Sequence, residues 1–131
     1  MKIKRGFTLL EMLVVIGIIA ILVTIGFASY STIQKKARDA KRQGDLKAAQ
    51  QVMEQCYSAN TNSYQYETIS VSASNVLSMT CPGSATLTFS IKDPLNTATY
   101  KYSVDPNTSS LYTITAVLET SADPYSVSNQ Q

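Results

Sequence analysis

The chain has 131 residues, a net charge of +2 and no histidine or tryptophan. Without histidine, the usual general base and the commonest metal ligand are both missing, and two cysteines alone cannot complete a zinc site. We therefore expect neither an enzyme nor a bound cofactor. The charge is unevenly spread: residues 35–47 hold six basic side chains, whereas the chain from Ala48 onward has two basic and six acidic residues.

The first predicted element is an apolar helix over residues 7–28, FTLLEMLVVIGIIAILVTIGFA. At 1.5 Å per residue it reaches about 33 Å, enough to cross the hydrocarbon core of a bilayer. Lys2, Lys4 and Arg5 precede it, which predicts a cytoplasmic N-terminus and an outward-facing remainder. Glu11 is the only charge inside the segment. Because a carboxylate at mid-membrane costs about 2.5–3.5 kcal/mol, we expect Glu11 to have a partner or a function.

Two general interpretations of this segment are open. One is a Sec signal peptide with a basic region over residues 1–5 and cleavage after Ala28, where Gly26 supplies a second small side chain. The length of the apolar run and the charge of Glu11 argue against it. The other is a plain membrane anchor in which Glu11 reaches toward the interface.

Residues 4–11, KRGFTLLE, closely resemble the class III signal of type IV pilins and pseudopilins, in which basic residues and a glycine precede Phe-Thr-Leu-x-Glu and an apolar helix. The resemblance continues through residues 12–22. It implies that residues 1–6 are a leader and that a prepilin peptidase cleaves between Gly6 and Phe7. The same enzyme is expected to N-methylate the new amino terminus of Phe7.

The resemblance also gives Glu11 a partner, the terminal amine of a neighbouring subunit in a filament. Pairing the two charges offsets the cost of burying each, and it fixes the axial register of the subunits. Thr8 is expected to hydrogen-bond beside this pair. Many pilins have a proline just after the apolar run, but this chain has Ala28 there, so the continuity of the helix stays open.

The helix is expected to continue over residues 29–57, which contain no proline. At 100° per residue, two sets of side chains lie on nearly opposite faces. One set is Tyr30, Ile33, Ala37, Ala40 and Ala48, and the other is Leu46, Ala49, Met53 and Cys56. The first would face neighbouring subunits and the second this subunit's own sheet, although a single irregular amphipathic helix fits as well. The basic residues 35–47 would meet lipid headgroups, acidic neighbouring subunits, or solvent with Asp39 paired to Lys35, Lys36 or Arg42.

Residues 58–131 are predicted to form a globular head. Residues 58–84 lack periodicity and are predicted to be a long loop with a helical turn near Val76-Leu77. Cys56 and Cys81 are interpreted as a disulfide that pins this loop, the alternative being two free thiols. Closing a ring of about 25 residues would contribute about 3.5 kcal/mol.

Three later segments alternate with period two and predict strands, at residues 85–92, 100–104 and 111–119. Asp105-Pro106-Asn107 is predicted to be the turn between the last two strands, and the tail after Pro124 is predicted to be irregular. The expected fold class is α+β, in which the long N-terminal helix packs on a small antiparallel sheet. This is the architecture of pilins.

A further resemblance, to the calcium-binding region of major pseudopilins, is faint. Asp93, Asn96, Asp105 and Asn107 could supply oxygen ligands there. Ordinary turn chemistry explains these residues better, so no metal is expected.

The function indicated is a structural subunit of a type IV pilus or related filament. The alternatives are a pseudopilin of a type II secretion system and a DNA-uptake pilin. Expected partners are copies of the chain, other pilins, the prepilin peptidase, the assembly machinery and, before assembly, the cytoplasmic membrane. Because the head is acidic, direct binding of nucleic acid is not expected.

Overall fold

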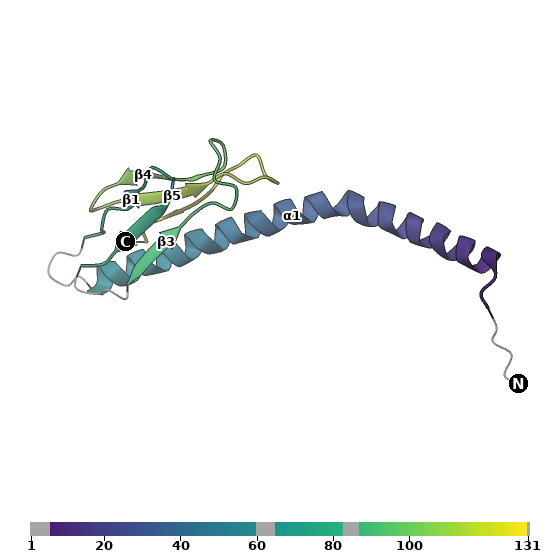
Figure 1. The fold of residues 1–131 in the computed structure, drawn as a ribbon. Coiled ribbons are helices and arrows are strands. Elements are labelled where there is room, and N and C mark those ends of the chain that lie inside the picture. The colour runs from purple at the N-terminus through teal and green to yellow at the C-terminus, as the bar shows by residue number, and fades with distance from the viewer. Residues whose placement is uncertain (1–5, 60–64, 83–86, 131) are drawn as a thin grey trace, which may run out of the picture. The chain divides into compact units, whose positions relative to one another are not determined.

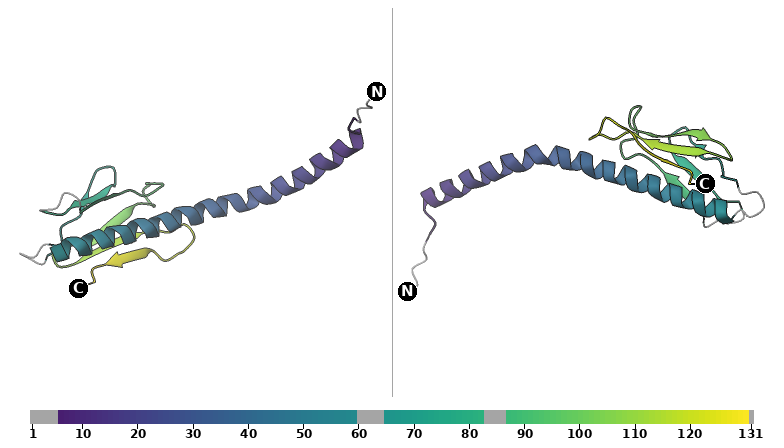
Figure 2. Two further views of the ribbon diagram at one scale, coloured as in Figure 1. Left: turned by 90° about the horizontal axis from the view of Figure 1, so that it is seen from below. Right: turned by 180° about the vertical axis from the view of Figure 1, so that it is seen from behind.

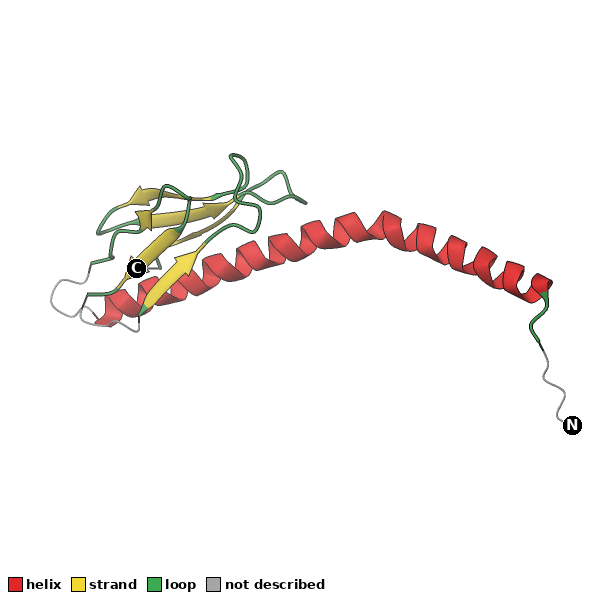
Figure 3. Cartoon of the chain, viewed as in Figure 1, coloured by secondary structure: helices red, strands yellow, loops and turns green. Residues whose placement is uncertain are grey.

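The computed structural model describes residues 6–59, 65–82 and 87–130. The described residues contain one helix, α1 (Leu9–Ala59), followed by six short strands (Figures 1 and 3). The strands are β1 (Ser70–Val71), β2 (Leu77–Thr80), β3 (Thr88–Ile91), β4 (Tyr102–Asn107), β5 (Tyr112–Ala116) and β6 (Tyr125–Ser128). The chain divides into two compact units, Met1–Lys35 and Lys36–Gln131. Lys2, Lys4 and Arg5 lie outside the described residues.

Helix α1 joins the two helical segments predicted from the sequence, but it begins at Leu9, two residues after the predicted start at residue 7. The first proline of the chain is Pro82, so nothing in residues 9–59 removes a backbone donor. The sequence left open whether the helix continues past the position where many pilins have a proline. In this structure it is continuous through Gly26 and Ala28. It ends at Ala59, two residues beyond the predicted end near Tyr57.

In the second unit, α1 buries one face against the strands, which gather along its C-terminal part (Figure 2). Leu46, Ala49 and Met53 are completely buried. Ala40 and Ala48 on the opposite side are exposed. The predicted assignment of this face of the helix to the subunit's own sheet is therefore confirmed.

The strands form two three-stranded antiparallel sheets, with the orders β1-β2-β3 and β4-β5-β6. Side chains alternate between core and surface, as period-two strands require. Strand β5 shows the full pattern, because Tyr112, Ile114 and Ala116 are completely buried and the residues between them are partly exposed. The α+β fold class is confirmed, with two small sheets in place of the single sheet expected.

Three local predictions about the head were wrong. The segment around Val76-Leu77 is not a helical turn, because Leu77 begins β2 and pairs with Ile91 of β3. The tail after Pro124 is not irregular, because β6 pairs with β5 and Val127 enters the core. Both strands have only four residues, too few for a convincing period-two pattern.

The third error concerns Asp105-Pro106-Asn107, which ends β4 instead of forming the turn. The register shifts between Val104 and Asn107, and the Asp105–Pro106 peptide bond is cis. Proline is tolerated in a sheet at bulges and on edge strands, and β4 is an edge strand with a bulge at this point. The connection to β5 lies further on, where Thr108 N–H donates to Leu111 O at 2.9 Å.

The predicted disulfide between Cys56 and Cys81 is present. It joins the last turn of α1 to the residue after β2, and both cysteines are almost fully buried. Close by on the helix, Glu54 accepts hydrogen bonds from the hydroxyls of Tyr66 at 3.0 Å and Tyr112 at 2.9 Å. These contacts hold the end of α1 to the strands.

Candidate processing and assembly site

The predicted cleavage site lies in exposed chain just before α1. Residues 6–8 are not helical, and the side chain of Phe7 is 82% exposed. A Cβ added at Gly6 would meet no atom within 4 Å. The Gly6–Phe7 bond is therefore open to approach on the described part of the chain.

Thr8 and Glu11 form a reciprocal capping box at the start of the helix. Thr8 N–H donates to Glu11 Oε2 at 2.8 Å, Thr8 Oγ1 donates to the same oxygen at 3.0 Å, and Glu11 N–H donates to Thr8 Oγ1 at 3.2 Å. A threonine at the N-cap and a glutamate three residues later satisfy each other's backbone donors. The two side chains that the sequence assigned to one site thus come together. Glu11 has its hydrogen-bond partner within its own chain and lies at the favourable positive end of the helix dipole.

The T-x-x-E spacing was visible in the sequence, and sequence reasoning missed its capping role. The box also explains why the helix begins at Leu9 and not at Phe7. The predicted scissile bond therefore falls outside the helix, two residues before its first turn.

The apolar part of α1 has no cover within the first unit. Large apolar side chains from Phe7 to Phe27 are between 47% and 83% exposed. The helix contains an 18-residue window long and apolar enough to cross a membrane, and none of that window is buried. Thr24 adds no unsatisfied hydroxyl, because its Oγ1 donates to Ile21 O at 2.7 Å. Such a surface needs lipid or other apolar helices around it.

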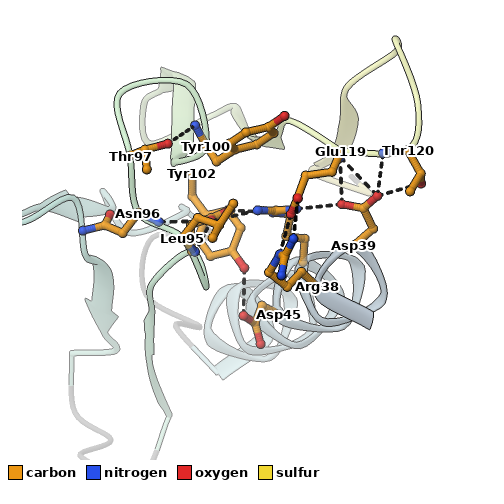
Figure 4. A network of polar contacts seen from close by, with 12 residues as sticks. Arg38, Asp39, Asp45, Leu95, Asn96, Thr97, Tyr100, Tyr102, Glu119 and Thr120 are labelled. Carbon is orange, nitrogen blue, oxygen red and sulfur yellow. Dashed lines mark hydrogen bonds and ion pairs between the residues drawn. The ribbon is translucent and has the colours of Figure 1, made fainter. Parts of the chain in front are cut away.

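A buried ionic cluster lies in the second unit, near the start of that unit's part of α1, where two loops meet the helix (Figure 4). Its centre is Arg42, whose side chain is 0% exposed. Arg42 Nε donates to Asp93 Oδ2 at 2.7 Å and Nη2 to Asp93 Oδ1 at 3.0 Å, while Nη1 donates to Asp39 Oδ1 at 2.7 Å and Glu119 Oε1 at 2.8 Å. The Tyr100 ring lies 5.0 Å from the guanidinium carbon. One arginine thus ties α1 to the loops after β3 and β5.

Two further contacts extend this cluster. Arg38 binds Glu119 with both ends of its guanidinium fork, at 2.7 and 2.6 Å. Asp39 accepts hydrogen bonds from the backbone N–H groups of Glu119 and Thr120 and from Thr120 Oγ1, the last at 2.7 Å. The sequence offered Arg42 as one of three partners for Asp39, and Arg42 is the partner found.

The cluster shifts the pKa values of its carboxyl groups downward. Hydrogen bonds from Arg38, and then from Arg42, lower the pKa of Glu119 to about 2. Burial opposes ionisation of Asp39, but hydrogen bonds from Glu119 N, Thr120 and Arg42 outweigh it and lower its pKa to about 2. Burial also opposes ionisation of Asp93, and the hydrogen bonds from Arg42 reverse it, so the pKa of Asp93 is lowered as well. All three carboxylates are therefore charged at neutral pH and held by arginine.

The four residues considered as calcium ligands are engaged differently from one another. Asp93 is held by Arg42, and Asn96 Nδ2 donates to Ser74 O at 3.0 Å. Asn107 bonds the backbone of Ile69 through both side-chain atoms, while Asp105 is exposed. Among the residues that the structure describes, no group of three or more His, Cys, Asp or Glu side chains could hold a metal ion.

Sequence reasoning missed Arg42 as the centre of this cluster. The spacing of Arg38, Asp39 and Arg42 hinted at charges on one helix face. Nothing in the sequence indicated that Asp93 and Glu119, 51 and 77 residues away, would fold back to meet them.

Comparison with known proteins identifies the class of protein from the N-terminal part of the chain. The prokaryotic N-terminal methylation motif, the motif of type IV prepilins, matches residues 1–27. Prepilin peptidase-dependent protein D of Escherichia coli (strain K12) is 59% identical over 34 residues, which are 26% of this chain and 23% of that relative. The match thus spans less than a quarter of the relative's length. No solved structure matches the chain.

The family follows from the rest of the chain. The family model described as "Type IV minor pilin ComP, DNA uptake sequence receptor" matches residues 28–125, about three quarters of the chain. The chain belongs to this family of type IV minor pilins, and the pilin interpretation of the N-terminal segment is confirmed. The families that match are pilin families, which are structural.

Proposed function

We propose that this chain is cleaved between Gly6 and Phe7 by a prepilin peptidase, N-methylated on Phe7, and assembled into a type IV pilus through the apolar part of α1. The main support is the match of the methylation motif to residues 1–27. The matched range includes the Gly6–Phe7 bond, where Phe7 is exposed, and the exposed apolar part of α1 that follows it. Under this proposal, residues 1–6 are a leader, 7–28 the membrane and filament-core helix, 29–57 its amphipathic continuation and 58–131 the head. The N-terminus faces the cytoplasm before assembly.

Glu11 has two successive partners in this proposal. In the free subunit its carboxylate caps its own helix through Thr8, at 2.8 and 3.0 Å. In the filament it also meets the Phe7 amine of a neighbouring subunit, a group that exists only after cleavage. Because a subunit shifted along the helix axis would leave the amine and the carboxylate unpaired, the pair fixes the register.

The test of this assignment is charge removal at Glu11 in a strain with the complete pilus machinery. Glu11→Gln keeps the shape of the side chain and can still accept hydrogen bonds in the capping box, but it cannot pair ionically with an amine. We expect the variant to be inserted and cleaved like the wild type and to appear in sheared pili at less than a tenth of the wild-type amount. Glu11→Asp, which keeps the charge on a shorter side chain, is the matched control and should retain part of the assembly. Equal amounts of Glu11→Gln and wild-type chain in pili would refute the role of Glu11.

Direct recognition of DNA is the second candidate, and the description of the family favours it. A DNA-binding surface needs exposed cations near the phosphates. On the head these are Lys92 and Lys101, both exposed, whereas Asp105 and Asp123 are exposed acids that oppose them. Our prediction from the acidic head is that the subunit does not bind nucleic acid directly.

Fluorescence anisotropy with a labelled DNA duplex and the full-length chain in detergent tests this second candidate. A dissociation constant that rises steeply with salt and weakens further in a Lys92→Gln/Lys101→Gln variant would establish the DNA-binding role. Absence of binding at 50 mM salt would leave the filament role alone. A Lys35→Gln/Lys36→Gln variant controls for loss of charge outside the head.

A further inference from the structure

The structure divides the basic residues of α1 into two groups. The ion pairs among the described residues all involve Arg38 or Arg42, whose guanidinium groups bind carboxylates of the head. The lysines of the same stretch are exposed, and none of them forms an ion pair within the described part of the chain. They are Lys35, Lys36, Lys41 and Lys47. The lysine charges are therefore available to another molecule.

Lys35 and Lys36 are the lysines closest to the apolar part of α1. Residues 29–34, which precede them, contain no charge, and every one of these residues is exposed. Tyr30 and Ile33 in this segment are 60% and 61% exposed. A tyrosine at the end of an apolar helix is typical of the boundary between membrane and water. Apolar, uncharged and basic segments thus follow one another in the order of the layers at one face of a bilayer.

The distance along the helix suits contact with lipid phosphates. Lys35 lies seven residues beyond residue 28, about 10 Å along a helix. The headgroup region extends about 5–8 Å beyond the hydrocarbon core on each side, and a lysine side chain can bend back to place its ammonium at that level. The chain has no acidic residue between Glu11 and Asp39, and Asp39 is buried and bound by Arg42. No carboxylate on this stretch of the helix therefore competes with a phosphate for the lysines.

We propose that Lys35 and Lys36 bind the phosphate groups of anionic phospholipids, on the side of the membrane that carries the head, before the subunit assembles. The inference rests on the proposed function, which places residues 7–28 in the membrane. Once the leader is cleaved off, these two lysines are the basic residues nearest to the bilayer. Each lysine beside an anionic surface strengthens binding by about fivefold. The pair keeps the inserted subunit among anionic lipids until it enters the filament.

Quenching of a single tryptophan by brominated lipids tests this contact. The chain has no tryptophan, so Phe27→Trp introduces one reporter at the end of the apolar part, at a side chain that is 75% exposed. The full-length variant is reconstituted in equimolar phosphatidylcholine and phosphatidylglycerol, with bromine on the acyl chains of one lipid or the other. The ratio of the two quenching efficiencies gives the relative binding constant of the lipids beside the helix. We expect phosphatidylglycerol to be preferred about threefold or more at low salt, and the preference to fall as salt is added.

Two double variants in the Phe27→Trp background separate the membrane-proximal lysines from general charge. Lys35→Gln/Lys36→Gln should reduce the preference to a ratio of about one. Lys41→Gln/Lys47→Gln removes the same charge about one and a half and three turns further along the helix and should keep the preference. Equal quenching by the two lipids in the parent, or a preference that survives Lys35→Gln/Lys36→Gln, would overturn the inference.

Failure of this inference differs from failure of the proposed function. If neither brominated lipid quenches the tryptophan, the segment does not enter the bilayer and the proposed function itself fails. If both lipids quench it equally, insertion stands and the lipid contact does not. A lower amount of Lys35→Gln/Lys36→Gln chain in sheared pili would then assign the two lysines to a protein partner in the filament.

Discussion

Removing Arg42 should destabilise the head far more than removing Arg38, although both arginines bind Glu119. In Arg42→Met, Glu119 keeps two hydrogen bonds from Arg38, and Asp39 keeps those from the 119–120 backbone and the Thr120 hydroxyl. Asp93 is different, because its side chain is 0% exposed and Arg42 is its ion-pair partner among the described residues. Leaving a buried carboxylate without its cation costs about 3–5 kcal/mol. Arg38→Met breaks a more exposed pair and should cost about 1 kcal/mol or less.

Guanidinium unfolding of the full-length chain in detergent micelles, followed by near-ultraviolet circular dichroism of the tyrosines, measures these differences. The structure also predicts which second change rescues Arg42→Met. Asp93→Asn should recover much of the lost stability, because it removes the stranded charge and keeps an acceptor for Leu95 N and Asn96 N. Glu119→Gln should recover little. A free energy of unfolding for Arg42→Met within about 0.5 kcal/mol of the wild-type value, or equal rescue by both second changes, would refute the role of Arg42 as the partner of buried Asp93.

Three further predictions concern other parts of the molecule. Replacing Cys56 and Cys81 by serine should lower the free energy of unfolding by about 2–4 kcal/mol, because the 25-residue separation is no longer closed in the unfolded chain; an unchanged denaturation midpoint would contradict this. In the folded chain the pKa values of Asp39 and Glu119 are about 2, below the roughly 3.9 and 4.3 of free side chains. The two ionised carboxylates therefore stabilise the head above about pH 4.5, and this stabilisation is lost as the pH falls toward 2. Thermal unfolding at pH 7, 4 and 2.5 measures the loss, and a melting temperature that is the same at all three pH values would disprove it. Thr8→Val should speed hydrogen exchange in the first turn of α1 by about fivefold in bicelles, whereas Thr8→Ser should not, and equal rates would exclude the capping box.

The helix was predictable because its signals are local and repeated. Residues 7–28 are apolar except for Thr8, Glu11 and Thr24. The two sets of side chains in residues 29–57 keep their spacing over several turns, so a single exception such as Gly44 does not hide the pattern. The pairing of Cys56 with Cys81 was predictable because there are only two cysteines.

The head was less predictable because its elements are short and its contacts are distant. Strands β2 and β6 have four residues each, and what identifies them is the partner strand and not their own pattern. Pro106 was interpreted as a turn residue, but the neighbouring bulge lets β4 continue through it. Nothing near Arg42 in the sequence predicts its burial. The cost of burying its charge is offset by Asp93 and Glu119, which the fold brings from distant parts of the chain.

Cleavage between Gly6 and Phe7 is tested most directly by the intact mass and N-terminal sequence of the full-length chain, purified from membranes of cells with and without a prepilin peptidase. We expect a peptidase-dependent product that begins at Phe7 and carries one additional methyl group on its amino terminus. A product that begins at Ser29 in both strains, or an uncut chain in both, would contradict it.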